Sequence, residues 1–373
     1  MIYLDYAATS PMSDQSLQAY TEVATKYYGN SSSSHDIGTT ANQLLEAARA
    51  KIARLLNGAK DGVYFTSGGS EGNFYAITSL VHAHKHKGKH LITTKTEHTS
   101  VYNTFRKLEL NGFDVTFLDV NEYGEVDPGR LEKEIREDTI LVSIAHVNHE
   151  IGTIQPIKEI VEILSKRNIL FHSDCVQSFT KTHLDIENYH LSSITVSSHK
   201  VYGPKGVGAC YIDPKVNWKP MIDGTTHEKG FRPGTVDVPG ITAFTIAAEE
   251  SMKSLARDMK KYQSLKKLFL QEVSTYNGIH IEGNYRSIPQ IIGFRVKGFE
   301  GQHVMLQYNR NNIAVSTGSA CSVGQQSPSK TLLAIGRTPD ESRELVRISF
   351  GRQTLKYEIL QAVNVLKNVL NET

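Results

Sequence analysis

The chain has 373 residues, of which 39% are hydrophobic and 21% are charged. At about 150 residues per domain, this length predicts one large domain and a second, smaller one, and it excludes a single small module. The composition can build a full core, which argues against extended disorder. Its 41 basic residues nearly balance its 39 acidic residues, which disfavours binding to nucleic-acid phosphates. We therefore expect an ordinary globular protein with no direct nucleic-acid partner.

The number and spacing of the cysteines predict the cellular compartment of the protein. Cys175, Cys210 and Cys321 form no CxxC pair and no even-numbered framework, a usage typical of the reducing cytosol. The segment MIYLDYAATSPMSD lacks a basic and then apolar leader, so no signal peptide is expected. The longest uncharged run, 311–329, is rich in Ser, Gly and Gln and cannot span a membrane. These features predict a cytoplasmic protein without membrane association.

Apolar segments rich in β-branched and aromatic residues alternate with helical patterns through much of the chain. In chain order, the predicted strands are 62–67, 90–94, 114–119, 139–147, 168–173, 193–198 and 208–213. The helical patterns between them lie at 43–56, 71–85 and 157–168. This alternation predicts an α/β fold with a mostly parallel, seven-stranded sheet and helices on both faces. In such sheets the ligand binds beyond the C-terminal ends of the strands.

Two stretches depart from this alternation. The histidine run HAHKHKGKH at 82–90 contains lysines that oppose a cation, so we expect a solvated helix end and no metal site. After about residue 240 a long helical stretch leads into shorter strands at 291–296 and 345–350. We expect a smaller α+β domain there. The predicted division assigns 14–255 to the large domain, and 1–13 together with 256–373 to the small one.

A glycine-rich turn follows the strand at 62–67. In the segment SGGSE (67–71) the glycines let the backbone approach an anion, and the helix that begins there offers its first N–H groups and the positive end of its dipole. This pattern indicates a phosphate site. The residues GGSEG also fit the G-x-S-x-G elbow of serine hydrolases, and Asp174 and His199 follow Ser70 in the order of that triad. Both interpretations stay open on this segment alone.

Three further strand ends carry reactive side chains. His98 follows the strand at 90–94, Asp174 follows 168–173, and Lys200 follows 193–198. A carboxylate at the end of an apolar run needs a partner, and lysine rarely ends an interior strand. A lysine for its aldehyde, a carboxylate for its ring nitrogen, an imidazole and a phosphate loop are the groups that pyridoxal phosphate requires. Such a site explains Lys200, which a hydrolase does not.

Motifs along nearly the whole chain resemble those of cysteine desulfurases, close to NifS and IscS, in the class V aminotransferase superfamily. They include YLDYAAT (3–9), FTSGGSE (65–71), TEH (96–98), HEIGTIQP (149–156), HSDCVQ (172–177), SSHKVYGPKGVGA (197–209), RPGT (232–235), STGSAC (316–321) and VRISFG (346–351). The resemblance implies pyridoxal phosphate as cofactor, fold type I of the enzymes that use it, and a homodimer.

The resemblance also implies how the cofactor is held. Lys200 would bond to it covalently, Asp174 would pair with the ring nitrogen, and His98 would stack on the ring and act as acid and base. Gln177 would reach the ring hydroxyl oxygen. The residues that would hold the phosphate are Gly69, Ser70, Ser197, His199 and, from the other subunit, Thr235.

The substrate implied by the resemblance is L-cysteine. Arg347 would clamp the substrate carboxylate with its planar fork, with Asn30 and Asn148 as further substrate contacts. Cys321 would attack the substrate sulfur, keep it as a persulfide while alanine leaves, and pass it to an acceptor thiol. The small polar residues at about 316–330 predict a mobile loop around Cys321. Cys175 and Cys210 are expected to be packing residues.

The chain departs from the pattern of the resembled family at two places. One bears on the contacts to the cofactor ring, and the other bears on the protein that accepts the sulfur. The chain has Asn148-His149 where many relatives have two asparagines, which leaves one ring contact open. It ends at Thr373, whereas relatives that serve an iron–sulfur scaffold tend to carry a longer tail. We therefore expect a dedicated acceptor, such as a rhodanese-type enzyme of tRNA thiolation, rather than a scaffold for iron–sulfur or cofactor biosynthesis.

Three alternatives to a cysteine desulfurase stay open. One is a class V aminotransferase or lyase without persulfide chemistry. Another is a serine hydrolase that uses Ser70. The third is a sulfur carrier that uses Cys321 alone and binds no cofactor.

Overall fold

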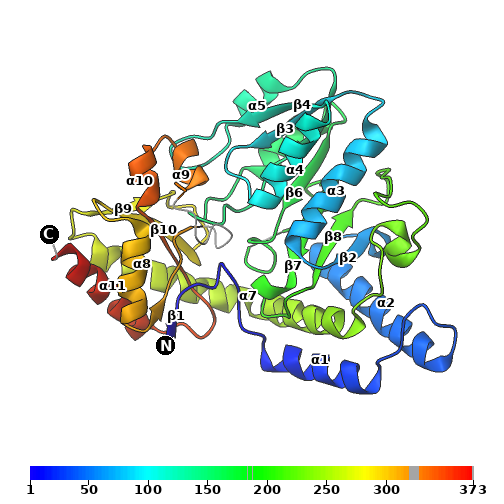
Figure 1. The fold of residues 1–373 in the computed structure, drawn as a ribbon, viewed down its shortest axis with the longest axis horizontal. Helices are drawn as coiled ribbons and strands as arrows, with labels where there is room; N and C mark the ends of the chain where they lie inside the picture. Colours follow the sequence, from blue (N-terminus) through cyan, green and yellow to red (C-terminus); the bar gives the residue numbers. More distant parts are fainter. Residues whose placement is uncertain (183, 187, 319–326, 372–373) are drawn as a thin grey trace.

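The computed structural model describes residues 1–182, 184–186, 188–318 and 327–371 (Figure 1). Cys321 and most of its predicted mobile loop therefore lie outside the described residues. The described chain builds one large sheet with its helices and a second, smaller group of strands and helices, and one long helix runs along both.

The large sheet has seven strands in the order β2-β8-β7-β6-β5-β3-β4. Their bounds are β2 (Val63–Thr66), β3 (His90–Thr94), β4 (Asp114–Leu118), β5 (Thr139–Ser143), β6 (Leu170–Asp174), β7 (Ser193–Ser197) and β8 (Gly208–Ile212). The neighbouring pairs from β7 to β4 are parallel, and β8 is antiparallel to both β2 and β7. The predicted mostly parallel, seven-stranded sheet is confirmed.

Helices cover both faces of this sheet. They are α1 (Asp14–Lys26), α2 (Asp36–Leu56), α3 (Gly69–His84), α4 (Thr99–Leu110), α5 (Pro128–Glu134) and α6 (Ile157–Ser165). Successive strand residues point to opposite faces, so Leu91 packs in the cluster that contains Phe105 of α4. Ile92 packs in the cluster that contains Ile52 of α2 and Ile160 of α6. All residues of β2, β3, β5, β7 and β8 are buried, as expected for strands covered on both faces, while the edge strand β4 is partly exposed.

The second group of strands belongs to the N-terminal segment and the last third of the chain. β9 (Ile279–Glu282), β10 (Ile291–Val296) and β12 (Leu345–Ser349) form an antiparallel sheet in the order β12-β10-β9, and β1 (Ile2–Tyr3) pairs with β11 (Ile313–Ala314). The helices of this group are α8 (Gly301–Arg310), α9 (Lys330–Ala334), α10 (Pro339–Arg343) and α11 (Lys356–Leu370). This is the α+β arrangement that the sequence predicts for this part of the chain.

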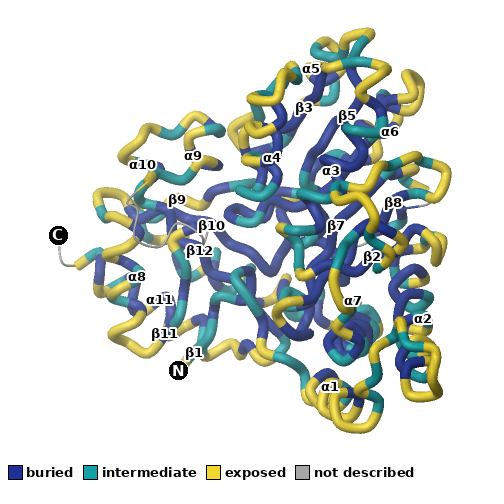
Figure 2. The backbone as a smooth tube through the Cα atoms, turned by 45° about the vertical axis from the view of Figure 1, so that its right-hand side comes forward, coloured by how far each residue is buried: buried dark blue, intermediate teal, exposed yellow. Residues whose placement is uncertain are grey.

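The long helix α7 (Val238–Val273) connects the two groups. Its 36 residues span about 54 Å at 1.5 Å per residue. It packs against α1 and α2 at one end and against α11 at the other (Figure 1). Residue 255, the predicted domain boundary, falls inside this helix, and the predicted division into domains stays a prediction. Buried residues follow the large sheet and the strands of the second group, while exposed ones gather on α1 and the outer loops (Figure 2). No helix of the described residues is long and apolar enough to cross a membrane.

Candidate active site

The C-terminal ends of β3, β6 and β7 meet at one edge of the large sheet, because these strands are parallel. β6 ends at Asp174, and β7 leads into the 3-10 turn η2 (Ser198–Lys200). His98 caps the N-terminus of α4, shortly after β3. The charges of Asp174 and Lys200 both act on the His98 imidazole, in opposite directions. The structure therefore brings together the three reactive residues that the strand pattern predicts.

Asp174 is buried, and both of its carboxylate oxygens accept hydrogen bonds. Asn73 Nδ2 donates to Oδ2 at 2.7 Å, and the Val176 N–H donates to Oδ1 at 2.9 Å. Asn73 also donates to Ser100 Oγ at 3.0 Å, and its Oδ1 lies 3.2 Å from His172 Nε2. Asn73 was not predicted from the sequence pattern. The signal that could have found it is its place one helical turn after Gly69, on the helix that begins at the glycine-rich turn.

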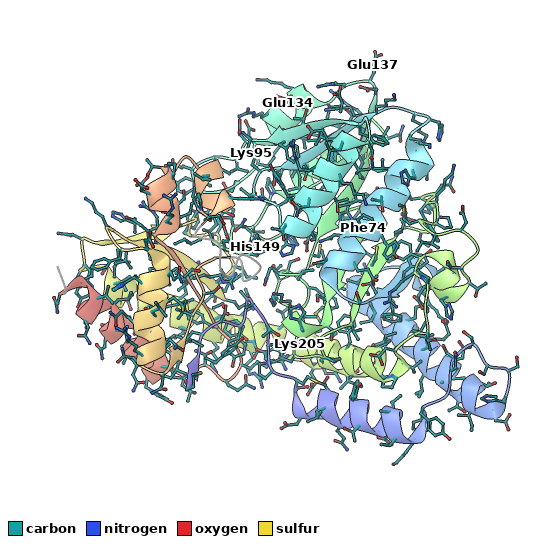
Figure 3. The ribbon with its side chains drawn as sticks, in the orientation of Figure 1. Phe74, Lys95, Glu134, Glu137, His149 and Lys205 are labelled. Atoms are coloured by element: carbon teal, nitrogen blue, oxygen red, sulfur yellow. The ribbon has the colours of Figure 1, made fainter. Side chains whose placement is uncertain are left out.

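The neutral His98 imidazole keeps its proton on Nε2. Its Nδ1 accepts the Ser100 N–H at 3.2 Å and lies 2.8 Å from Ser100 Oγ, so Nδ1 acts as the acceptor. Burial lowers the pKa of His98, Asp174 opposes that effect and Lys200 adds to it. The His149 ring meets His98 edge-on with 5.4 Å between the ring centroids, between the two sheets (Figure 3). Burial, with His98, Arg347 and Lys200, also lowers the pKa of His149, well below 6.5, so that His149 is neutral.

The Lys200 ammonium is held by the N-terminal segment. Its Nζ donates to the carbonyl oxygens of Ala7 and Ala8, at 2.5 and 2.6 Å. The same segment accepts Gln177, whose Nε2 donates to the Ala7 oxygen at 2.9 Å. Residues far apart in the sequence thus position the lysine, and sequence analysis gave Ala7 and Ala8 no role.

A cradle for an anion lies at the start of α3. Gly68 has φ +151°, a conformation that residues with a side chain rarely adopt, and a Cβ on Gly208 would lie 2.7 Å from Gly68 Cα. The hydroxyl of Ser197, beside this turn, is buried and has no hydrogen-bond partner among the described residues. Gly69 and Ser70 provide the first residues of the helix. An unpartnered hydroxyl beside a helix N-terminus fits a phosphate group.

The remaining predicted phosphate contacts are His199 and Thr235. His199 Nδ1 lies 3.1 Å from Thr9 Oγ1, and burial together with Lys200, Lys181 and Lys205 lowers its pKa to about 3. Thr235 is exposed, in the segment before α7. In that segment Arg232 donates to Glu71 Oε2 at 2.8 Å, which ties it to the first turn of α3.

The serine hydrolase interpretation has no geometric support in the described residues. Ser70, Asp174 and His199 are not hydrogen-bonded to one another there: Asp174 contacts Asn73 and Val176, and His199 contacts Thr9. A triad needs the serine, histidine and acid hydrogen-bonded in series.

Arg347 lies in β12 and is 2% exposed. Its Nη2 donates to Asp5 Oδ1 at 2.9 Å and its Nη1 to the His149 carbonyl oxygen at 2.8 Å. Its Nε is buried and has no hydrogen-bond partner among the described residues. The guanidinium therefore stands between the N-terminal segment and the loop at Asn148, with a donor left for a ligand.

The two asparagines that are predicted to contact the substrate lie in different environments. Asn148 is buried, and its Oδ1 accepts the N–H groups of Glu150 and Ile151 at 2.9 and 3.0 Å, so its amide shapes its own loop. Asn30 is exposed in the loop between α1 and α2, and this loop lies on the other side of the molecule from β12 (Figure 2). Within the one chain, Asn30 is not brought to Arg347.

The described residues on either side of 319–326 contact the site. The Ser316 backbone pairs with that of Arg347, with N···O distances of 2.7 and 3.1 Å. Ser329 Oγ donates to Glu150 Oε2 at 2.6 Å. Cys175 and Cys210 are buried, and burial raises the pKa of both thiols to about 12. Both are packing residues, as predicted.

Glu97, between β3 and His98, is a buried carboxyl group that sequence analysis gave no role. Its Oε1 accepts Thr94 Oγ1 and the Ala145 N–H, both at 2.9 Å, while Oε2 has no partner among the described residues. Burial raises the pKa of Glu97 to about 8, and the charge of Asp174 adds to this. At neutral pH Glu97 is therefore largely a neutral acid.

Replacing Glu97 with glutamine is expected to stabilise the chain at alkaline pH. Since its folded pKa exceeds the ordinary 4.5, the stability that the protonated carboxyl contributes is complete below about pH 4.5 and is lost as the pH rises toward 8. Glutamine keeps the acceptor and removes the ionisation, a gain of up to roughly 4 kcal/mol at about 1.4 kcal/mol per pKa unit. Urea unfolding should show the gain at pH 8 and little at pH 5. The matched change at exposed Glu137 (Figure 3) should have no such pH dependence; equal behaviour of the two variants would contradict the assignment.

Comparisons with known proteins agree with this geometry. The aminotransferase class-V family model matches residues 2–361. The NifS protein of Bacillus subtilis (strain 168) is 45% identical over 368 residues, 98% of this chain and 93% of that protein. Cysteine desulfurase IscS of Neisseria gonorrhoeae (strain ATCC 700825 / FA 1090) is 39% identical over 379 residues, covering 100% of this chain and 92% of that protein.

Solved structures agree as well. One titled a NifS-like protein matches with a TM-score of 0.93 and 30% identity over 100% of both chains. Another, titled SspA in complex with cysteine, matches with a TM-score of 0.83 and 31% identity over 95% of this chain and 100% of that one. The predicted fold is thereby confirmed, and the chain belongs to the aminotransferase class-V family, whose enzymes depend on pyridoxal phosphate.

Proposed function

We propose that this chain is a cysteine desulfurase, which converts L-cysteine to L-alanine and keeps the sulfur as a persulfide on Cys321. The observation that carries the proposal is the meeting of Lys200, Asp174 and the unpartnered Ser197 hydroxyl at one sheet edge. A relative named cysteine desulfurase IscS and a similar structure titled a complex with cysteine support the choice of substrate.

The residues at this edge fit pyridoxal phosphate. The group supplies an electron sink when it is bound. Lys200 would bond to it, Asp174 would hold its ring nitrogen and Gln177 its ring oxygen. The phosphate would lie on Ser197, His199 and the start of α3 at Gly69 and Ser70, where the described structure has a helix N-terminus and a free hydroxyl.

Arg347 binds the substrate carboxylate in this proposal, because its planar fork matches a carboxylate and its Nε lacks a partner among the described residues. Lys200, once it is neutral, takes the α-proton of the substrate. His98 gives or takes a proton at Nε2, since its Nδ1 is engaged by Ser100. Each group thus acts at a defined atom.

The sulfur step belongs to Cys321. Its thiolate attacks the sulfur of the substrate, so that an S–S bond forms and the substrate C–S bond breaks. The electron pair of that bond stays on the carbon, which takes up a proton and leaves as L-alanine. The outer sulfur then passes to the thiol of an acceptor protein. Support comes from Ser316 and Ser329, which flank residues 319–326 and are hydrogen-bonded to Arg347 and Glu150, respectively.

We also propose a cytoplasmic homodimer with shared active sites. Thr235 is exposed, and Asn30 belongs to the loop between α1 and α2, which lies on the other side of the molecule from β12 (Figure 2). Both placements suit residues that serve the other subunit's site. A rhodanese-type enzyme of tRNA thiolation is the proposed acceptor, in preference to an iron–sulfur scaffold. Transfer of labelled sulfur from the loaded chain to each purified candidate tests this choice, and transfer to the scaffold alone would refute it.

Identification of the products from L-cysteine tests the proposed function. The chain incubated with pyridoxal phosphate, L-cysteine and a thiol reductant should form alanine and sulfide in equal amounts. A lyase would release pyruvate, and an aminotransferase would form a keto acid only when an amino acceptor is added. If pyruvate or a keto acid forms in place of alanine, the proposal is wrong and the chain has the corresponding lyase or aminotransferase activity.

A further inference from the structure

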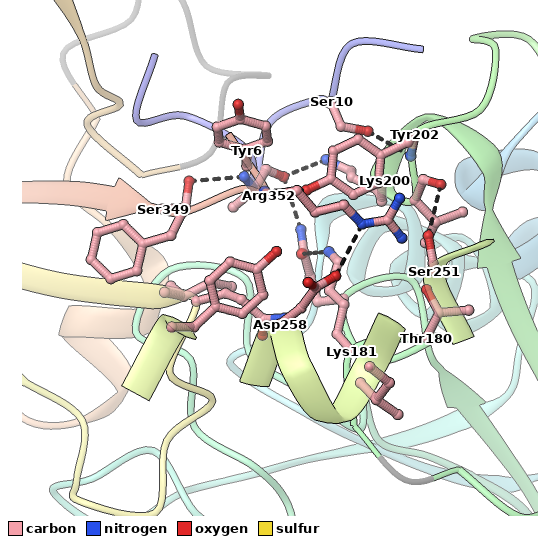
Figure 4. Close-up of a pocket in the computed structure, with 18 residues that line it drawn as sticks. Tyr6, Ser10, Thr180, Lys181, Lys200, Tyr202, Ser251, Asp258, Ser349 and Arg352 are labelled. Atoms are coloured by element: carbon pink, nitrogen blue, oxygen red, sulfur yellow. Dashed lines mark hydrogen bonds and ion pairs between the residues drawn. The ribbon is translucent and has the colours of Figure 1, made fainter. Parts of the chain in front are cut away.

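A small cavity adjoins Lys200 (Figure 4). Its volume is about 30 Å³, room for one or two water molecules. The titratable and charged side chains that line it, besides Lys181, are Lys200, Tyr6, Tyr202, Asp258, Tyr262 and Arg352. The Thr180 hydroxyl also lines it, is buried, and has no partner among the described residues. The cavity thus brings titratable side chains and an unpartnered hydroxyl directly beside Lys200.

Lys181 faces this cavity, and no carboxylate of the described residues is paired with it. Asp258 is the one carboxylate among the described residues that line the cavity, and it is already paired with Arg352 at 3.0 Å and Arg257 at 3.2 Å. Burial lowers the pKa of Lys181 to about 7, and the like charges of Lys200 and Arg347 add to this. A lysine whose pKa is lowered by burial and by neighbouring like charges is found more often at functional sites than elsewhere.

The partner that Lys181 does have is the carboxamide of Gln177. Lys181 Nζ donates to Gln177 Oε1 at 3.0 Å, and Gln177 Nε2 donates to the Ala7 oxygen at 2.9 Å. That oxygen also accepts Lys200 Nζ at 2.5 Å. The two lysines are therefore joined through one carboxamide and one carbonyl group.

These two contacts select a single orientation of the Gln177 amide. While Lys181 is protonated, its ammonium group can only donate, so it requires the oxygen end, and a carbonyl oxygen can only accept, so it requires the NH₂ end. The flipped amide would face like groups at both ends. Among the described residues, Ala7 is the one acceptor for Gln177 Nε2, so its second N–H is left for a ligand.

We propose that Lys181 is a positioning residue, which holds the Gln177 carboxamide so that its second N–H reaches the ring oxygen of the cofactor. The inference rests on the proposed function, in which Gln177 contacts that oxygen. A hydrogen-bond donor at the ring oxygen favours the anionic form of that oxygen. A positive charge nearby disfavours the binding of a proton where the cofactor is bonded to Lys200. Without Lys181, that proton should be held to a higher pH.

The experiment is a pH titration of the visible absorbance of the chain loaded with pyridoxal phosphate. Lys181→Met should raise the midpoint by roughly one pH unit and weaken cofactor binding several-fold. Lys181→Arg keeps a donor cation and should return the midpoint toward the native value. The matched control is Lys266→Met: Lys266 is also a lysine whose pKa burial lowers, to about 8, but it donates to the Ser287 oxygen outside the cavity. This control should leave the midpoint unchanged.

An unchanged midpoint in Lys181→Met, or equal shifts in Lys181→Met and Lys266→Met, would overturn the inference. If Lys181→Met fails to fold by circular dichroism, Lys181→Gln decides instead. That variant can offer a neutral donor to Gln177 Oε1, and a midpoint equal to the native one would show that the lysine cation is not needed. Failure of the proposed function looks different, because the native chain would then develop no visible absorbance with pyridoxal phosphate.

Discussion

Replacing Lys200 with alanine is expected to remove the visible absorbance of the cofactor-loaded chain and to lower alanine formation from L-cysteine by at least roughly 10³-fold. Lys200 supplies both the amine that bonds to the cofactor and the base for the α-proton, so one substitution removes two functions. Because its ammonium contacts the carbonyl groups of Ala7 and Ala8 at the surface of the site, alanine should leave the fold intact. Absorbance spectra and alanine quantification of the purified variant check the result.

The matched control for this prediction is Lys205→Ala. Lys205 is exposed and lies in the same segment of the chain, five residues after Lys200 (Figure 3). Its removal should preserve the absorbance and most of the activity. A Lys200→Ala variant that keeps the native turnover would refute the proposed site. Turnover that is blocked by serine-directed reagents would revive the hydrolase based on Ser70.

Replacing Asp174 with asparagine is expected to lower alanine formation by roughly 10²- to 10³-fold while the cofactor still binds. A neutral amide cannot hold the ring nitrogen in its protonated form, so the ring withdraws electrons less well. The substitution also turns an amide toward Asn73 Nδ2, which now donates to the carboxylate at 2.7 Å. Steady-state kinetics should show the loss mainly in kcat, since binding of the substrate carboxylate depends on Arg347.

Asp119→Asn is the control for Asp174. Asp119 directly follows β4, the strand beside β3, but its carboxylate pairs on the surface with Lys95 and Arg130. Such an exposed pair contributes about 0 to 1 kcal/mol, so activity should stay near native. An Asp174→Asn variant as active as this control would mean that the ring nitrogen needs no charged partner here.

Much of the large sheet was predictable because most of its strands are buried on both faces and are rich in apolar and β-branched residues. The predicted strand at 139–147 is longer than β5, which ends at Ser143, although Ile144 and His146 still donate to the β6 carbonyl groups of His172 and Asp174. Short elements such as β1 and β11 were not predicted. Each has two residues and exists through pairing with a distant segment, which a local pattern does not contain.

The site was predictable where chemistry coincides with strand ends. Lys200, Asp174 and His98 follow from the rule that parallel strands place their C-terminal ends at one edge. That rule does not predict the roles of Asn73, Glu97 and the carbonyl groups of Ala7 and Ala8, because their contacts arise only when separate segments pack together. The same limit explains Lys181, whose spacing of four residues from Gln177 gains meaning only once Ala7 lies beside that amide.

The most direct test of the whole account is the mass of the peptide that carries Cys321 after one turnover with L-cysteine and no acceptor. We predict one added sulfur atom on Cys321 for each alanine formed, both in the native chain and in Cys210→Ala, whose lost thiol is buried and protonated. Cys321→Ser should carry no added sulfur. Alanine formation with the sulfur on another residue, or sulfur loading of Cys321→Ser equal to that of the native chain, would contradict the account.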